Sequence, residues 1–185
     1  VENDRFLNFI LDEEYKPRLA LQMMSDGSIE ISRFDHKDNW QPWDAIPAED
    51  TLTSDIIALD KDGITVFMTD SRNRNTSAVI ACNLDNRQTT LLAEDALADA
   101  QDVMRHPTEK HIQAVSFVYE RKAWHVLDQS IESDLTNLHM VADGDLEIVS
   151  RSLDDKFWVV LYIVDDGPAR FYIYNRSTQI ADFLF

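Results

Sequence analysis

The residues of this sequence that could do chemistry are scattered, and none of them completes a catalytic motif. No G-x-S-x-G pentapeptide occurs, so the sharp turn that presents a catalytic serine is missing and a Ser-His-Asp triad cannot be assigned. The chain also has no glycine-rich phosphate loop, no H-E-x-x-H and no C-x-x-C. We therefore expect neither catalytic nor cofactor-binding residues here.

The residues that could bind a metal ion are not at ligand spacing. The chain has five histidines in different segments: His36, His106, His111, His125 and His139. His106 and His111 could meet across a turn, but a third ligand is not evident. The run Asp60-Lys61-Asp62-Gly63 resembles part of a calcium loop, yet the acidic residues around it are not spaced as ligands, so a hairpin turn is favoured. We expect no metal site.

Two acidic pairs and one basic pair are the remaining polar candidates. Asp154-Asp155 and Asp165-Asp166 could act as paired carboxylates, but both fall between strand-like runs, and we interpret them as solvated turns. Arg72 and Arg74 form a compact basic pair in a long polar connection. These two arginines are our candidates for contact with an acidic group of a substrate or partner.

The aromatic residues and the cysteine are expected to belong to the core. Four tryptophans could form a ligand-stacking surface, but side chains of this size are more often packed between sheets. They are Trp40, Trp43, Trp124 and Trp158. Cys82 is the only cysteine, so no internal disulfide can form, and its place in an apolar run indicates a small buried thiol rather than a reactive one.

Composition excludes several classes of function. Asp and Glu number 34 against 17 Lys and Arg, which gives a formal charge of −17. Such a surface repels nucleic-acid phosphates and anionic membranes, so we expect neither as a partner. No apolar stretch approaches the ~20 residues that span a bilayer. The chain begins with Val1 rather than methionine, so we expect a processed or excised piece, and its compartment, cytoplasmic or periplasmic, stays open.

Short apolar runs and turn residues alternate along the whole chain, which is typical of antiparallel strands. The second strand of each predicted unit begins at Arg18, Ile64, Ile112 or Trp158, at spacings of 46, 48 and 46 residues. Repeats of this length with four strands each are typical of β-propeller blades. With only four glycines, Asp and Asn must serve most of the turns. An antiparallel sandwich with evenly spaced strands is the alternative.

We predict an all-β fold, with about four antiparallel four-stranded propeller blades in an open arc and short helices in the connections. One domain covers 1–185, with blades at roughly 1–50, 51–98, 99–144 and 145–185. The prolines near Trp40 indicate an edge strand or packed loop there, and 130–140 has helical apolar spacing. The long segments 41–54, 70–76, 93–101 and 128–145 should lie at one end of the blades, where binding usually resides.

Several stretches resemble the propeller domain of the prolyl oligopeptidase family of serine peptidases, in its acylaminoacyl-peptidase-like bacterial branch. They cover most of the chain, more clearly after Pro17, and match only the C-terminal blades. The matching stretches are 69–76, 91–95, 113–115, 124–128, 143–145, 150–155, 166–168, 174–176 and 183–185.

The resemblance implies a non-catalytic role. In that family the propeller caps an α/β-hydrolase domain, which follows it in sequence and supplies the catalytic triad. The propeller limits access to short peptides, so the resemblance implies that this chain gates and selects peptide substrates for a hydrolase domain absent from it. The expected partners are therefore that hydrolase domain and peptide substrates. Unpaired blade edges could also give a homo-oligomer. The alternatives are a stand-alone propeller-like scaffold that binds a protein and, less favoured, a small hydrolase with an unrecognised site.

Overall fold

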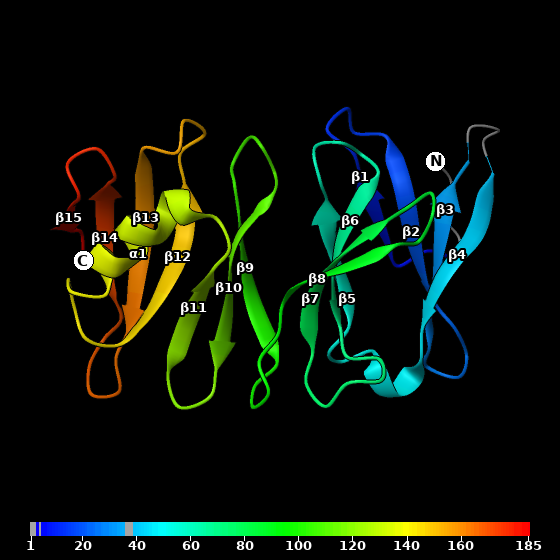
Figure 1. Ribbon diagram of the computed structural model, residues 1–185, viewed down its shortest axis with the longest axis horizontal. Helices are drawn as coiled ribbons and strands as arrows, with labels where there is room; N and C mark the ends of the chain where they lie inside the picture. Colours follow the sequence, from blue (N-terminus) through cyan, green and yellow to red (C-terminus); the bar gives the residue numbers. More distant parts are fainter. Residues whose placement is uncertain (1–2, 4, 36–38) are drawn as a thin grey trace. The chain divides into compact units, whose positions relative to one another are not determined.

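The computed structural model describes residue 3 and the ranges 5–35 and 39–185, and this part of the chain is built from antiparallel sheets (Figure 1). Its contacts divide the chain into two compact units, Val1–Ala100 and Gln101–Phe185, which are described separately. The predicted all-β class is confirmed. The helices that the structure describes are short, and none has the length and apolar character needed to cross a membrane.

The first unit holds two four-stranded sheets with strands in sequential order. Sheet A consists of β1 (Asn8–Leu11), β2 (Pro17–Met23), β3 (Ile29–Phe34) and β4 (Trp40–Ile46). Sheet B consists of β5 (Asp55–Leu59), β6 (Thr65–Asp70), β7 (Ala78–Asn83) and β8 (Thr89–Ala93), and the short helix η1 (Ala48–Asp50) connects the two sheets.

Strand β4 is an edge strand of sheet A, as its prolines indicated. The pairing with β3 passes from Ile31 opposite Asp44 to Ser32 opposite Pro42, so Trp43 is the extra residue of a bulge. Proline is tolerated at an edge and at a bulge because its missing N–H breaks no ladder hydrogen bond there. The bulge turns the Trp43 indole into the core.

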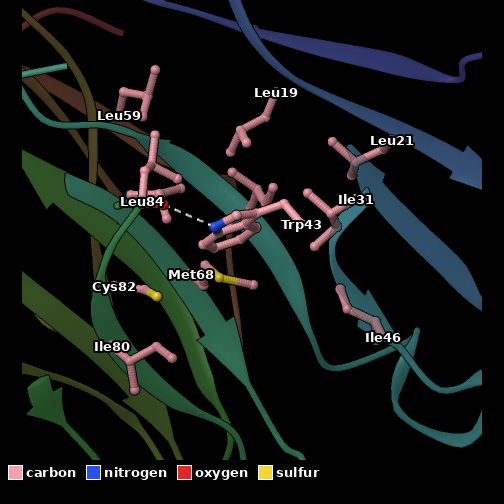
Figure 2. Close-up of a cluster of buried hydrophobic side chains, with 12 residues drawn as sticks. Leu19, Leu21, Ile31, Trp43, Ile46, Leu59, Met68, Ile80, Cys82 and Leu84 are labelled. Carbon is pink, nitrogen blue, oxygen red and sulfur yellow. Dashed lines mark hydrogen bonds between the residues drawn. The ribbon is translucent and has the colours of Figure 1, made fainter. Parts of the chain in front are cut away.

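The core of the first unit lies between sheets A and B, around Trp43 (Figure 2). The indole N–H donates to the Leu84 carbonyl oxygen at 3.1 Å, so its polar atom is satisfied although the side chain is only 5% exposed. Aliphatic side chains from both sheets, among them Leu19, Ile31 and Met68, pack around the ring. This contact fixes sheet A against sheet B.

The second unit holds a three-stranded and a four-stranded sheet. Sheet C has the order β11-β10-β9, and sheet D runs from β12 to β15. Their bounds are β9 (Ala100–Arg105), β10 (Ile112–Val118), β11 (Lys122–Val126), β12 (Asp145–Arg151), β13 (Phe157–Ile163), β14 (Arg170–Asn175) and β15 (Ile180–Phe183). Helices η2 (Gln129–Ile131) and α1 (Glu132–Leu138) stand between β11 and β12.

The expectation of four strands therefore needs correction for sheet C. After β11 the buried residues Ile131, Leu135 and Leu138 follow the helical spacing predicted for 130–140. They pack on sheet D around Trp158, and in Figure 1 helix α1 crosses one face of that sheet. A helical apolar stripe cannot alternate in and out as a half-buried strand must, so the segment adopts a helix instead of a fourth strand.

The place of the connection after β11 also differs from the prediction. Because β9, β10 and β11 run antiparallel, the chain leaves β11 at the end of sheet C where the β9–β10 turn lies. The segment 128–145 therefore does not lie wholly at the end predicted for long loops. Each predicted blade range contains one sheet, whereas the single domain and the open arc stay predictions.

Candidate functional site

The two candidate arginines lie in the loop between β6 and β7. The Arg72 Nε donates to Asp70 Oδ1 at 2.8 Å, and Nη1 donates to Asp44 Oδ2 and to the Ala45 carbonyl oxygen, both at 2.9 Å. The Asp70 and Asp44 carboxylates raise the pKa of Arg72 further above its usual value. The guanidinium thus joins sheet B to the edge strand of sheet A, and only 21% of its side chain is exposed.

Arg74 is held less tightly. Its Nη1 donates to Glu94 Oε2 at 2.5 Å, and the two side chains are 31% and 52% exposed. Among the described residues, the acidic partners of Arg72 are Asp70 and Asp44 and that of Arg74 is Glu94, so the two arginines do not share one. Their contact with a substrate or partner stays a prediction, and Arg74 is the more accessible of the two.

A hydroxyl cluster at the base of the same loop was not foreseen from the sequence. Ser71 Oγ donates to Asp50 Oδ1 at 2.7 Å and lies 2.9 Å from Ser54 Oγ, while Thr53 Oγ1 donates to Ser71 Oγ at 2.7 Å. Ser54 and Ser71 are buried. These bonds anchor the start of the loop to the segment that precedes β5, so the cluster positions the loop that carries both arginines.

A small cavity of about 170 Å³ lies beside Arg72 in the first unit. It is lined by Trp43, Asp44, Met68, Arg72, Ile80, Cys82, Arg87 and Thr89. Cys82 is 5% exposed, and burial raises the pKa of its thiol, which keeps the sulfur protonated at neutral pH. The predicted small buried thiol is confirmed.

A larger groove of about 450 Å³ lies in the second unit between β9 and β12. At its edge the Lys122 ammonium, with a side chain only 2% exposed, contacts the carboxylates of Asp102 and Glu147. The same ammonium lies 5.1 Å from the centre of the Trp124 ring. One cation therefore holds β9, β11 and β12 together. In the sequence, this buried cation was indicated only by its spacing from Trp124: two residues apart in a strand, the two side chains point to the same face.

Of the histidines, His106 and His111 contact each other as the sequence indicated. His106 and His111 stack across the predicted turn with ring centres 5.4 Å apart, and His111 Nε2 lies 3.0 Å from Asp128 Oδ2. Hydrogen bonds from Gln113 and His111 lower the pKa of Asp128. His36 lies outside the described residues. In the described ranges no three His, Cys, Asp or Glu side chains are grouped as a metal would require.

The turn predictions have mixed outcomes. Asp62 Oδ1 accepts the backbone N–H groups of Ile64 and Thr65, so the run 60–63 is a hairpin turn as expected. Asp165 is exposed and pairs with Arg121, which fits a solvated turn. The solvated interpretation of Asp155 is wrong, because this residue is only 6% exposed.

Asp155 belongs to a buried charged network behind Trp158. Its carboxylate accepts hydrogen bonds from the Trp158 indole at 2.8 Å, from Arg151 Nε at 2.6 Å and from Arg176. Both guanidinium groups lie over the Trp158 ring, with Cζ 4.7 Å and 5.1 Å from its centre. Trp43 and Trp158 are thus core residues as expected, whereas Trp40 and Trp124 are only partly buried.

The described residues form antiparallel sheets joined by turns and short helices, and comparison with known proteins gives the relatives of the chain. No family model matches the chain. Over 185 residues it is 37% identical to dipeptidyl aminopeptidase BIII of Pseudoxanthomonas mexicana, covering 100% of this chain and 27% of that protein. Over 193 residues it is 28% identical to dipeptidyl peptidase family member 6 of Caenorhabditis elegans, covering 98% of this chain and 26% of that protein.

Two solved structures show the same fold. The structure of TolB from Acinetobacter baumannii aligns with 98% of this chain over 43% of its own length, with a TM-score of 0.58 and 13% sequence identity. A prolyl endopeptidase structure aligns with 97% of this chain over 26% of its own length, with a TM-score of 0.66 and 10% sequence identity.

The chain spans about a quarter of the length of these curated relatives. The resemblance to a propeller portion of prolyl oligopeptidase-type peptidases is thereby confirmed: the chain is similar throughout to one part of two dipeptidyl peptidases, and its sheets have the matching fold. One relative is from a bacterium and the other from a nematode, so the likeness extends beyond a bacterial branch.

Proposed function

We propose that this chain is the non-catalytic propeller portion of a serine peptidase, and that it gates and selects peptide substrates for a hydrolase domain outside this chain. The observation that carries the proposal is the 37% identity over all 185 residues to a part, 27%, of a dipeptidyl aminopeptidase. The absence of a nucleophile motif from the sequence fits this division of labour.

The rigid construction of the first unit supports a selecting role. A substrate filter must keep its shape while peptides pass, and ion pairs held by packed strands provide such a frame. Arg72 joins two sheets and Ser71 anchors the loop start, so the exposed Arg74 is presented from a fixed base. In this proposal Arg74, with Arg72 behind it, contacts acidic groups of peptides.

The reading frame around the chain tests the peptidase assignment. A downstream strand, G-x-S-x-G and helix, followed by Asp and His, is the expected result. A frame that ends near Phe185 would contradict the proposal and favour the alternative, a stand-alone scaffold that binds a protein.

The role of Arg74 is tested in the full-length peptidase. Arg74→Ala should lower kcat/KM about two- to fivefold for a peptide with an acidic side chain, because a partly exposed pair contributes about 0.5–1 kcal/mol. The same peptide with the neutral amide in place of the acid should be unaffected. Arg121→Ala, which removes an exposed ion pair with Asp165 on a turn of the second unit, serves as control. Equal losses for both peptides would contradict the assigned contact.

A further inference from the structure

The groove of the second unit lies between two strand edges. Among the described strands, β9 ends sheet C and β12 ends sheet D. Residues 102–105 of β9 and 147–151 of β12 line the groove, whose volume is about 450 Å³. The outer edge of an end strand presents main-chain N–H and C=O groups that can pair with a further strand. The groove therefore has walls that can bind another main chain.

Hydrogen bonds on either side of Val103 show which way its main chain points. The Asp102 N–H donates to Ser116 Oγ of β10 at 2.9 Å, so the main chain of Asp102 faces β10. The Arg105 carbonyl oxygen accepts from Arg151 Nη1 of β12 at 3.0 Å, so it faces the groove. Main-chain groups of successive strand residues point alternately to the two sides of the strand. Val103, two positions before Arg105, therefore directs its N–H and C=O into the groove.

The opposite wall contributes apolar side chains. In the pairing of β12 with β13 the register shifts between Ile148 and Ser150, so Val149 is the extra residue of a bulge. Such a residue is left out of the ladder, and a bulge can re-aim its side chain. Val149 is 52% exposed, and Leu153, which also lines the groove, is 77% exposed. The groove thus combines a main-chain donor and acceptor on one wall with accessible apolar surface on the other.

Two bridges between the walls set the length of the groove. The Lys122 ammonium contacts the carboxylates of Asp102 on β9 and Glu147 on β12. Farther along, Arg151 of β12 reaches the Arg105 carbonyl oxygen of β9. The stretch of β9 between these bridges covers about three residue rises, or about 10 Å. The bridges also hold the walls apart at a fixed separation, so a ligand meets a site that is already formed.

We propose that this groove binds a short extended peptide, which pairs with the main chain of Val103 and places an apolar side chain against Val149 and Leu153. In strand addition, main-chain hydrogen bonds give affinity and side-chain contacts give specificity. A residue of an extended peptide has its N–H and C=O on the same side, which is the arrangement that Val103 requires. The inference deepens the proposed selection of peptides, and it rests on that proposal for the source of the peptide.

Titration of the isotope-labelled 185-residue chain with acetyl-Ser-Val-Ser-Val-Ser-amide, followed by NMR, tests the proposal. This peptide is uncharged, so the formal charge of −17 on the chain does not attract it. Because few contacts are made, we expect a Kd on the order of 0.1–1 mM. The backbone amide resonances of Val103 and Val149 should shift as the peptide binds. Shifts confined to residues outside the groove, or no shifts at several millimolar peptide, would overturn the proposal.

Two N-methylated peptides separate main-chain pairing from other modes of binding. One carries methyl groups on the valine nitrogens and the other on the serine nitrogens. In an extended peptide only one of these two sets of N–H groups faces the strand edge. One analogue should therefore lose binding at least about fivefold relative to the other, and equal affinities would contradict strand addition.

A pair of variants at Val103 gives the same test from the side of the protein. Val103→Pro removes the N–H that faces the groove, and proline is tolerated at a strand edge where that group takes no part in the ladder. It should raise Kd by at least about fivefold, whereas Val103→Ala keeps the N–H and should raise Kd less. Equal losses would overturn the pairing. Absence of binding would leave the peptidase assignment standing, because the reading frame around the chain tests that assignment separately.

Discussion

At the scale of single residues, the second unit depends on one buried carboxylate. Asp155 accepts from Trp158, Arg151 and Arg176, and its side chain is 7% exposed. Arg176 continues the network to Asp134, whose other oxygen accepts the Tyr174 hydroxyl at 2.9 Å. Burial, together with that bond to Asp134, raises the pKa of Tyr174 to about 12. The network joins β12, β13, β14 and helix α1.

We predict that Asp155→Asn destabilises the chain by about 3–5 kcal/mol, because removing one partner of a buried ion pair leaves uncompensated charge inside the protein. The neighbouring Asp154→Asn is the matched control. Asp154 is 54% exposed and pairs with an exposed lysine, so its loss should cost less than about 1 kcal/mol. Urea unfolding of both variants measures the difference, and similar midpoints would show that the network does not contribute as described.

Some single-residue roles were readable from the sequence and others were not. Trp158 and Cys82 lie in apolar runs, and Trp43 is a large aromatic residue, so the burial of all three follows from their chemistry. Arg151 is a local partner of Asp155, four residues away, but Arg176 reaches Asp155 and Glu147 reaches Lys122 from segments more than 20 residues away in the sequence. Sequence spacing does not encode these distant pairings, so the charged core could not be predicted as a whole.

At the scale of elements, turn geometry is the part that the sequence predicted least completely. Asp and Asn side chains do serve turns, since Asp12, Asn83 and Asn175 accept local backbone N–H groups. Among the residues that the structure describes, six other than glycine nevertheless take positive φ. They are Tyr15, Asn73, Arg87, Lys110, Asp155 and Gln179. Of these six, Asn73 and Asp155 are of the residue types that favour this conformation, and the other four are not, so residue type alone did not predict them.

The repeat of strands was predictable for a different reason. Alternating apolar residues and turn formers recur with the period of a four-stranded unit, and three of the four sheets have that form. Sheet C departs from it because the segment after β11 carries a helical stripe, a signal also present in the sequence. The residue range of each sheet could be predicted from the local pattern of apolar residues and turn formers. The residues at which individual strands end depend on packing and could not.

Gly144 directly precedes β12, and its backbone conformation is required where the chain enters that strand. It has φ of +113°, and a Cβ there would lie 2.4 Å from the Ile163 carbonyl oxygen. Gly27, in the β2–β3 turn, also has positive φ, at +87°, but a Cβ would meet only Ala48 Cβ at 3.5 Å.

We expect Gly27→Ala to cost about 1–2 kcal/mol for the backbone conformation alone. Gly144→Ala should cost clearly more, because its added methyl also collides with a backbone atom that cannot turn aside. Thermal or urea unfolding compares the two variants. Equal losses would mean that β13 moves to accommodate the methyl group and that the close approach is not required.

At the scale of the whole molecule, the excess of acidic residues is the dominant electrostatic feature. The 34 carboxylates and 17 basic groups leave repulsion that extends over the surface of the folded chain. Salt has two opposite effects on such a protein. It screens the general repulsion, which stabilises the folded state, and it weakens exposed ion pairs, which are worth only about 0–1 kcal/mol each. Buried pairs such as Arg151–Asp155 are screened much less.

The balance favours stabilisation by salt, since the general repulsion involves many charges and the exposed pairs contribute little. Raising NaCl from about 0.01 M to about 0.15 M shortens the Debye length from about 30 Å to about 8 Å. We predict that Tm at pH 7 rises by at least about 2 °C, measured at low micromolar chain concentration so that self-association does not contribute. KCl should act equally if screening is the cause. At pH 4.4, the isoelectric point of the sequence, the rise should vanish, and a rise as large as at pH 7 would show that net charge is not responsible.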